Sequence, residues 1–193
     1  MKMTHLTLEL PAWLAAETEA DPVCPTVEAR MRLAIRLARR NMAEGGGPFG
    51  AVIAERSTGR VLSAGVNRVV PGNCSVAHAE IMAIMAAQQL LGHYDLGRPD
   101  FPAFELATTT EPCAMCLGAI PWSGVRWLVC GARGDDACAI GMDEGAKPPH
   151  WREELQKRGI GVECDVCRDE SLLLLEEYRL AGGVIYNSRQ LLH

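Results

Sequence analysis

The chain has 193 residues, of which 48% are hydrophobic and 22% charged, a balance typical of one soluble globular domain. Its net charge of −5 disfavours a protein that binds by neutralising nucleic-acid phosphates, and no apolar run approaches the roughly 18 residues that span a bilayer. Glu9, Glu17 and Glu19 interrupt any apolar part of a secretory signal, so we expect a cytoplasmic protein. The acidic charge and the lack of a long apolar run favour a small-molecule substrate and no nucleic-acid or membrane partner.

Hydrophobic periodicity and turn signals predict helices that alternate with strands. In chain order we expect an irregular N-terminal extension over 1–25, a helix from the N-cap Thr26 to the glycines at 45–47, strands over 49–55 and 61–67, a helix over 75–92, a strand over 106–110, a helix over 112–122, a strand over 125–131, a short helix over 135–140, a strand near Val162 and a helix over 169–181. This alternation predicts an α/β sandwich around a central sheet.

The helix that begins at Thr26 carries a basic stripe, made of Arg32, Arg36, Arg39 and Arg40. Such a stripe is what a protein that binds a phosphate backbone would need. It is more often the solvated face that lies opposite an apolar one, and we interpret it in that way here.

Two short motifs carry most of the functional information: His78-Ala79-Glu80, and the segment Pro112 to Cys116, which contains Cys113. In this order they match the H-x-E and P-C-x-x-C signature of zinc deaminases. A zinc ion that activates water needs three protein ligands and one open position. His78, Cys113 and Cys116 supply the three ligands, and Glu80 is then free to move protons.

The spacing of these residues also predicts where they lie. A glutamate two residues after a histidine is about 200° away around a helix, so the two side chains converge only beyond the helix N-terminus. Cys113 and Cys116 share a face of a first helical turn. We therefore expect two helix N-termini to point at one metal ion, where their dipoles favour thiolates.

A structural zinc module without catalysis is the alternative from a different class of protein. It requires a fourth protein ligand, and the motifs offer only Glu80, which is better placed as an acid and base. A second C-x-x-C, formed by Cys164 and Cys167, has no evident partner pair, and we interpret it as two ordinary thiols.

The motifs resemble the cytidine-deaminase superfamily, and the resemblance covers residues 26–181. Residues 47–52 and 110–119 fit the branch that contains guanine deaminases and tRNA adenosine deaminases. Residues 140–145 resemble the acidic segment of bacterial guanine deaminases, including those that accept aminotriazines such as ammeline. The resemblance implies a cytidine deaminase-like three-layer α/β/α sandwich around a mixed five-stranded sheet, one Zn²⁺ per subunit and a homodimer.

The resemblance also assigns roles to individual residues. They are His78, Cys113 and Cys116 as zinc ligands, Glu80 as proton shuttle, Glu144 as a second acid, Asn67 and the Ala79 backbone N–H as substrate contacts, and Trp122 as an aromatic wall of the base pocket. Residues 26–181 would form the deaminase domain. The tail over 182–193 is a candidate lid, with Tyr186 and Asn187 as candidate pocket residues.

The implied reaction is hydrolytic deamination of a free base, from guanine to xanthine and ammonia, with ammeline as a further substrate. The alternatives are deamination of adenosine in tRNA and deamination of cytosine or a nucleoside. The tRNA reaction needs a basic channel for a flipped base, which an acidic chain with Asp143 and Glu144 by the pocket does not indicate.

Overall fold

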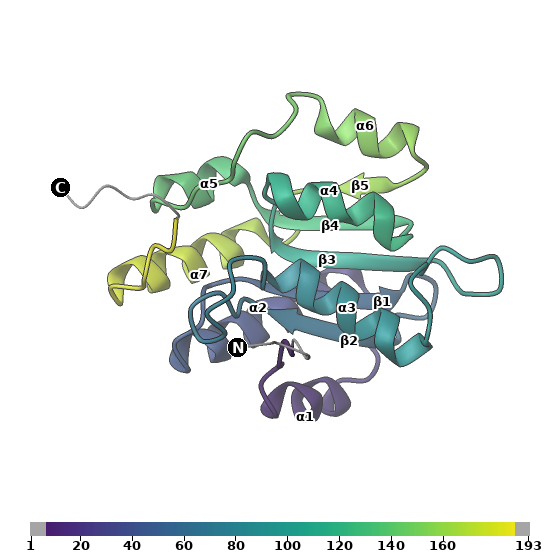
Figure 1. Ribbon diagram of the computed structural model, residues 1–193, viewed down its shortest axis with the longest axis horizontal. Helices are drawn as coiled ribbons and strands as arrows, with labels where there is room; N and C mark the ends of the chain where they lie inside the picture. The colour runs from purple at the N-terminus through teal and green to yellow at the C-terminus, as the bar shows by residue number, and fades with distance from the viewer. Residues whose placement is uncertain (1–6, 188–193) are drawn as a thin grey trace, which may run out of the picture.

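The computed structural model describes residues 7–187, which form five strands and seven helices (Figure 1). The strands are β1 (Gly50–Glu55), β2 (Val61–Val66), β3 (Phe104–Thr110), β4 (Trp127–Ala132) and β5 (Gly161–Glu163). The helices are α1 (Trp13–Ala20), α2 (Val27–Ala43), α3 (Ala79–Leu91), α4 (Ala114–Ser123), α5 (Gly134–Ala139), α6 (Trp151–Lys157) and α7 (Arg168–Leu180).

The strands form one mixed sheet in the order β2-β1-β3-β4-β5. β1 is antiparallel to both β2 and β3, whereas β3, β4 and β5 run parallel. The helix α4 connects β3 to the adjacent parallel strand β4, as a parallel pair requires. The sheet confirms the predicted mixed five-stranded α/β fold.

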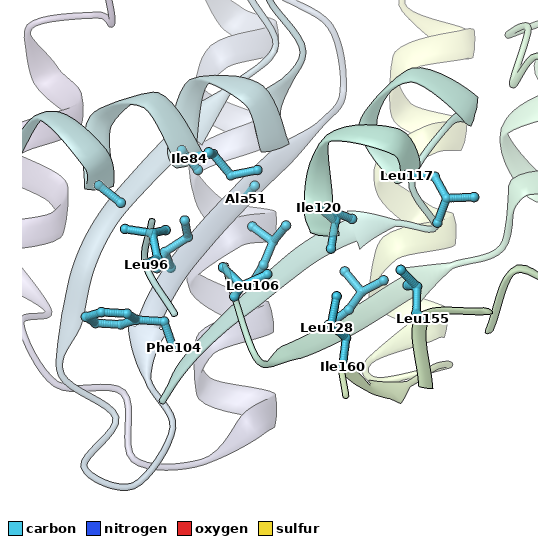
Figure 2. Packing of buried hydrophobic residues seen from close by; sticks show 14 of the residues in the cluster. Ala51, Ile84, Leu96, Phe104, Leu106, Leu117, Ile120, Leu128, Leu155 and Ile160 are labelled. Carbon is cyan, nitrogen blue, oxygen red and sulfur yellow. The ribbon is translucent and has the colours of Figure 1, made fainter. Parts of the chain in front are cut away.

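Helices cover both faces of the sheet, which gives the predicted three layers (Figure 1). Alternate residues of a strand point to opposite faces. Leu106 and Leu128 therefore pack with Ile84 of α3 and Ile120 of α4 on one face, as Figure 2 shows. The intervening residues, such as Ala107, pack on the other face against α2 and α7.

Helix α2 begins as its sequence predicts, because the Thr26 hydroxyl accepts a hydrogen bond from Ala29 N at 3.1 Å. The basic stripe on this helix is fully ion-paired, which supports its interpretation as a solvated face. The pairs are Arg32–Glu170, Arg39–Glu177, Arg36–Asp21 and Arg40–Glu17. The stripe therefore pairs with acidic residues of α7 and the N-terminal segment and does not present free cations.

Three sequence predictions were wrong in detail. The N-terminal extension is not irregular, because it contains α1, whose Leu14 is only 3% exposed and packs against α2 and the sheet. The short helix α6 was not predicted, although Trp151 and Leu155 are both buried on one face. Helix α3 begins at Ala79, four residues later than predicted. Helices of seven or eight residues have weak local signals and depend on tertiary packing.

Within residues 7–187 no helix combines the length and the apolar character needed to cross a membrane.

Candidate functional site

Two helix N-termini meet near the ends of the central strands. His78 is the N-cap of α3 and Cys113 is the N-cap of α4, and both have extended backbones, with ψ of 155° and 170°. An extended N-cap lets its side chain lie beyond the helix end instead of along the helix surface. Cys116 follows in the first turn of α4 and is buried.

The ligand atoms of His78, Cys113 and Cys116 all lie within 4.8 Å of one another. His78 Nδ1 is 3.5 Å from Cys113 Sγ. In the part of the chain that the structure describes, this is the one cluster of three or more such residues that is close enough to bind a metal ion. The predicted convergence of two helix N-termini is confirmed.

The donor set fits zinc, which binds thiolate sulfur and imidazole nitrogen. A hydrogen bond from the Cys116 thiol lowers the pKa of Cys113 to about 4, and His78 contributes in the same direction. The same hydrogen bond and burial raise the pKa of Cys116. One thiolate is thus already favoured, and a divalent cation that replaces the shared proton would stabilise both.

Glu80 lies in the first turn of α3 and is only 6% exposed. Burial raises the pKa of its carboxyl, although the nearby His78 opposes that shift. Glu80 is not a member of the metal-binding cluster. A buried carboxyl with a raised pKa beside such a cluster is suited to carrying a proton.

These residues open onto one small cavity. Its lining residues are Phe49, Asn67, His78, Glu80, Thr108, Thr110, Glu111, Cys113, Met142, Asp143, Glu144, Tyr186 and Asn187. The structure therefore brings the predicted residues Asn67, Glu80 and Glu144 together around the metal cluster. Ala79 is buried at the start of α3, directly after His78.

Trp122 lies apart from the cavity within one chain. It is 86% exposed and borders a groove between α4 and α6 that also includes Trp151. Trp122 therefore does not line the cavity of its own subunit, where it was expected as an aromatic wall. The reason is positional, since Trp122 lies near the C-terminal end of α4 and the metal ligands lie at the N-terminal end.

Glu144 lies on the loop that follows α5. Its carbonyl accepts a hydrogen bond from Ala114 N at 2.8 Å, which fixes the loop to the first turn of α4. Burial raises the pKa of its carboxyl to about 7, although Lys147 Nζ, 3.2 Å from Oε2, opposes this shift. Glu144 therefore changes protonation state near neutral pH. No sequence pattern predicts the contact between Glu144 and Lys147.

The end of the described chain closes over the cavity. The Tyr186 hydroxyl accepts a hydrogen bond from Asn67 Nδ2 at 2.9 Å. Asn187 accepts from Asp143 N at 2.9 Å and donates to Gly141 O at 2.8 Å. The predicted lid extends to residue 193, and its last six residues lie outside the described range.

The second C-x-x-C does not form a comparable site. Cys164 packs against the core that includes the buried Cys130 of β4, and Cys167 is the N-cap of α7. No metal-binding cluster includes either residue among those described. This arrangement agrees with two ordinary thiols.

A family model described as the cytidine and deoxycytidylate deaminase zinc-binding region matches residues 25–132, which contain both motifs. The chain belongs to this family. The cluster of His78, Cys113 and Cys116 is accordingly the zinc-binding site of a deaminase-family enzyme.

Guanine deaminases are prominent among the similar proteins. A solved structure of guanine deaminase from Nitrosomonas europaea is 47% identical, with a TM-score of 0.90, over 93% of this chain and 99% of that one. A similar crystal structure, bound to 2,6-diaminopurine, is 49% identical, with a TM-score of 0.89, over 95% of this chain and 97% of that one. Guanine deaminase from Bacillus subtilis is 39% identical over 61% of this chain and 71% of its own length.

A structure of a deaminase that edits the wobble position A34 of transfer RNA is less similar. It is 28% identical, with a TM-score of 0.57, over 75% of this chain and 97% of that one.

Proposed function

We propose that this protein is a zinc-dependent hydrolase that deaminates a free base, converting guanine to xanthine and ammonia. The observation that carries the proposal is the presence of two separate carboxyls, the buried Glu80 and the partly buried Glu144, in one small cavity beside the His78, Cys113 and Cys116 cluster. Similarity to guanine deaminases over nearly the whole chain supports the choice of base.

Zinc would be held by His78, Cys113 and Cys116. When bound, it supplies the Lewis acidity that lowers the pKa of a coordinated water from 15.7 to about 7. Glu80 accepts a proton from the attacking water and delivers it to the ring nitrogen next to the amino-bearing carbon. Its burial beside the cluster supports this role, and positioned acid–base catalysis contributes about 10²- to 10⁴-fold.

Glu144 carries the second proton of the attacking water to the departing amine. The C–N bond breaks, a C=O bond forms, and the amine leaves as ammonia. A pKa of about 7 supports a group that both accepts and donates a proton at neutral pH.

Asn67 and the Ala79 backbone N–H orient the base. The Asn67 side chain is 1% exposed at the end of β2, and its amide already donates to Tyr186. Ala79 begins α3, where the backbone N–H groups lack partners within the helix. Within this proposal residues 26–181 form the deaminase domain, and the tail over 182–193 acts as the lid.

We also propose a homodimer. Trp122 is a large aromatic residue that is 86% exposed, and aromatic residues are enriched in the cores of protein interfaces. Trp122 would contact the base only from a neighbouring subunit. Size-exclusion chromatography with light scattering tests the assembly, and a monomer at micromolar concentration would contradict it.

Deamination of tRNA has less support. A tRNA substrate needs a basic surface, whereas the four arginines of the α2 stripe are all paired with acids. Tyr186 and Asn187 also close over the cavity into which a flipped nucleotide would have to enter.

One panel of assays tests these alternatives with zinc-loaded protein. Ammonia release is measured from guanine, ammeline, cytosine, cytidine and adenosine, together with inosine formation in tRNA. We expect release from guanine and a lower rate with ammeline. Inosine formation in tRNA without release from any free base would overturn the proposal.

A further inference from the structure

Lys147 is a cationic side chain in an enclosed position, because it is only 15% exposed. Its ammonium lies 3.2 Å from Oε2 of Glu144 and 3.9 Å from Oε2 of Glu111. These two carboxylates are 11% and 8% exposed. An enclosed ammonium requires such partners, since burying an unpaired charge is costly.

The surrounding backbone is shaped to admit this ammonium. Gly134 begins α5, and a Cβ atom there would lie 2.4 Å from Lys147 Nζ. Any other residue at position 134 would displace the lysine side chain. Glu111 is fixed beside it, because its carboxylate accepts from Gly134 N at 3.1 Å and from Arg152 at 2.5 Å.

Glu144, in contrast, is held at one oxygen. Lys147 makes the one side-chain hydrogen bond to the Glu144 carboxylate from residues 7–187, and that bond is to Oε2. The same side chain lines the cavity. The lysine therefore leaves the other carboxylate oxygen available to a substrate.

We propose that Lys147 is a positioning residue for Glu144: its ammonium holds one oxygen of this carboxylate and favours its charged form. The inference rests on the proposed function, in which Glu144 accepts a proton before it delivers that proton to the leaving amine. Cys113 and Glu80 oppose the ionisation of Glu144, whereas His78 favours it when its imidazole is protonated. Lys147 also favours it, and it is the cation that contacts the Glu144 carboxylate directly, at 3.2 Å.

The size of the effect follows from this geometry. An opposite charge at such a distance lowers a carboxyl pKa by about 1 to 3 units. Replacing Lys147 by methionine, which has a similar shape and no charge, should raise the pKa of Glu144 by that amount. Starting from a pKa of about 7, a rise of one unit reduces the ionised fraction at pH 7 about fivefold.

The test compares Lys147→Met, Lys147→Gln and Lys147→Arg with Lys157→Met as a matched control. Lys157 also pairs with a glutamate three residues away, Glu154, but its side chain is 69% exposed. Glu144 is titrated directly by ¹³C-carboxyl NMR of the zinc-loaded protein, and its resonance is assigned from Glu144→Gln. We expect an upward shift with Met and Gln, little change with Arg, and none in the control.

The second measurement is the pH dependence of kcat on guanine. The limb that reports Glu144 should move to higher pH in Lys147→Met, and Lys147→Met should add no further loss in a Glu144→Gln background. An unchanged Glu144 titration, or an equal loss of kcat in both backgrounds, would overturn the role of Lys147. If the wild-type protein releases ammonia from no base, the proposed function fails, whereas the NMR titration still decides whether Lys147 controls Glu144.

Discussion

Replacing Glu144 with glutamine should reduce activity and stabilise the fold at neutral and alkaline pH. Burial raises the pKa of this carboxyl from 4.5 to about 7 in the folded protein. A group whose pKa is higher in the folded state favours folding while it is protonated, and its contribution is lost as the pH rises through the folded value. Glutamine cannot ionise, so Glu144→Gln avoids that loss.

The magnitude follows from the two pKa values. A difference of about 2.5 units corresponds to about 3 kcal/mol, because one unit is worth about 1.4 kcal/mol. The wild type and Glu144→Gln should therefore have similar stability at pH 4. The variant should be more stable by up to about 3 kcal/mol at pH 9, with most of the change between pH 4.5 and 7. Its kcat on guanine should fall about 10²- to 10⁴-fold.

The assay is guanidinium-induced unfolding of both proteins at matched free zinc concentration, at intervals between pH 4 and 9. Taking the difference between the two proteins removes the contributions of the titrating groups that do not interact with Glu144. A difference that stays constant with pH, or that favours the wild type at pH 9, would show that the Glu144 pKa is not raised. Wild-type activity in the variant would separately remove Glu144 from the proposed mechanism.

Three further predictions concern the metal site and the core. Glu80→Gln should retain one zinc per subunit by metal analysis, while its kcat falls about 10²-fold or more. Cys113→Ala should lose both the zinc and the activity. Loss of zinc from Glu80→Gln would mean that Glu80 is a ligand. Removal of zinc by a chelator should abolish ammonia release and lower the melting temperature, and added zinc should restore both; full activity in metal-free protein would contradict the zinc mechanism. Arg30→Met should lower the free energy of unfolding by about 3 kcal/mol in denaturant titrations. Glu105 is fully buried and would keep only Arg56 as a cationic partner. A loss below about 1 kcal/mol would show that Arg56 alone compensates the charge of Glu105.

Much of the fold was predictable because long elements carry their own signals. Thr26 and the apolar spacing of α2 located that helix to within a few residues, and the alternation of helices and strands indicated the layered sheet. The helices α1 and α6 were not predicted, because each is short and is stabilised by residues that are distant in the sequence. Leu14, for example, packs against α2 and the sheet.

The exposed position of Trp122 shows the same limit within the site. The helix that contains this residue was predicted, with Cys113 and the metal at its N-terminal end. No local pattern reveals whether Trp122, at the opposite end, faces the cavity of its own subunit, because that depends on how α4 crosses the sheet between β3 and β4.

The amino-acid sequence by itself determined the zinc ligands and the chemistry they imply, because metal ligation depends on residue type and on spacing within single helical turns. His78 with Glu80, and Cys113 with Cys116, are separated by three residues at most. Only the tertiary structure decided what surrounds the metal. The sheet and its loops bring separate segments of the chain to one edge. There Lys147 contacts Glu144, Tyr186 contacts Asn67, and Asn187 contacts Asp143. No local sequence pattern specifies these contacts, because they depend on the path of the whole chain.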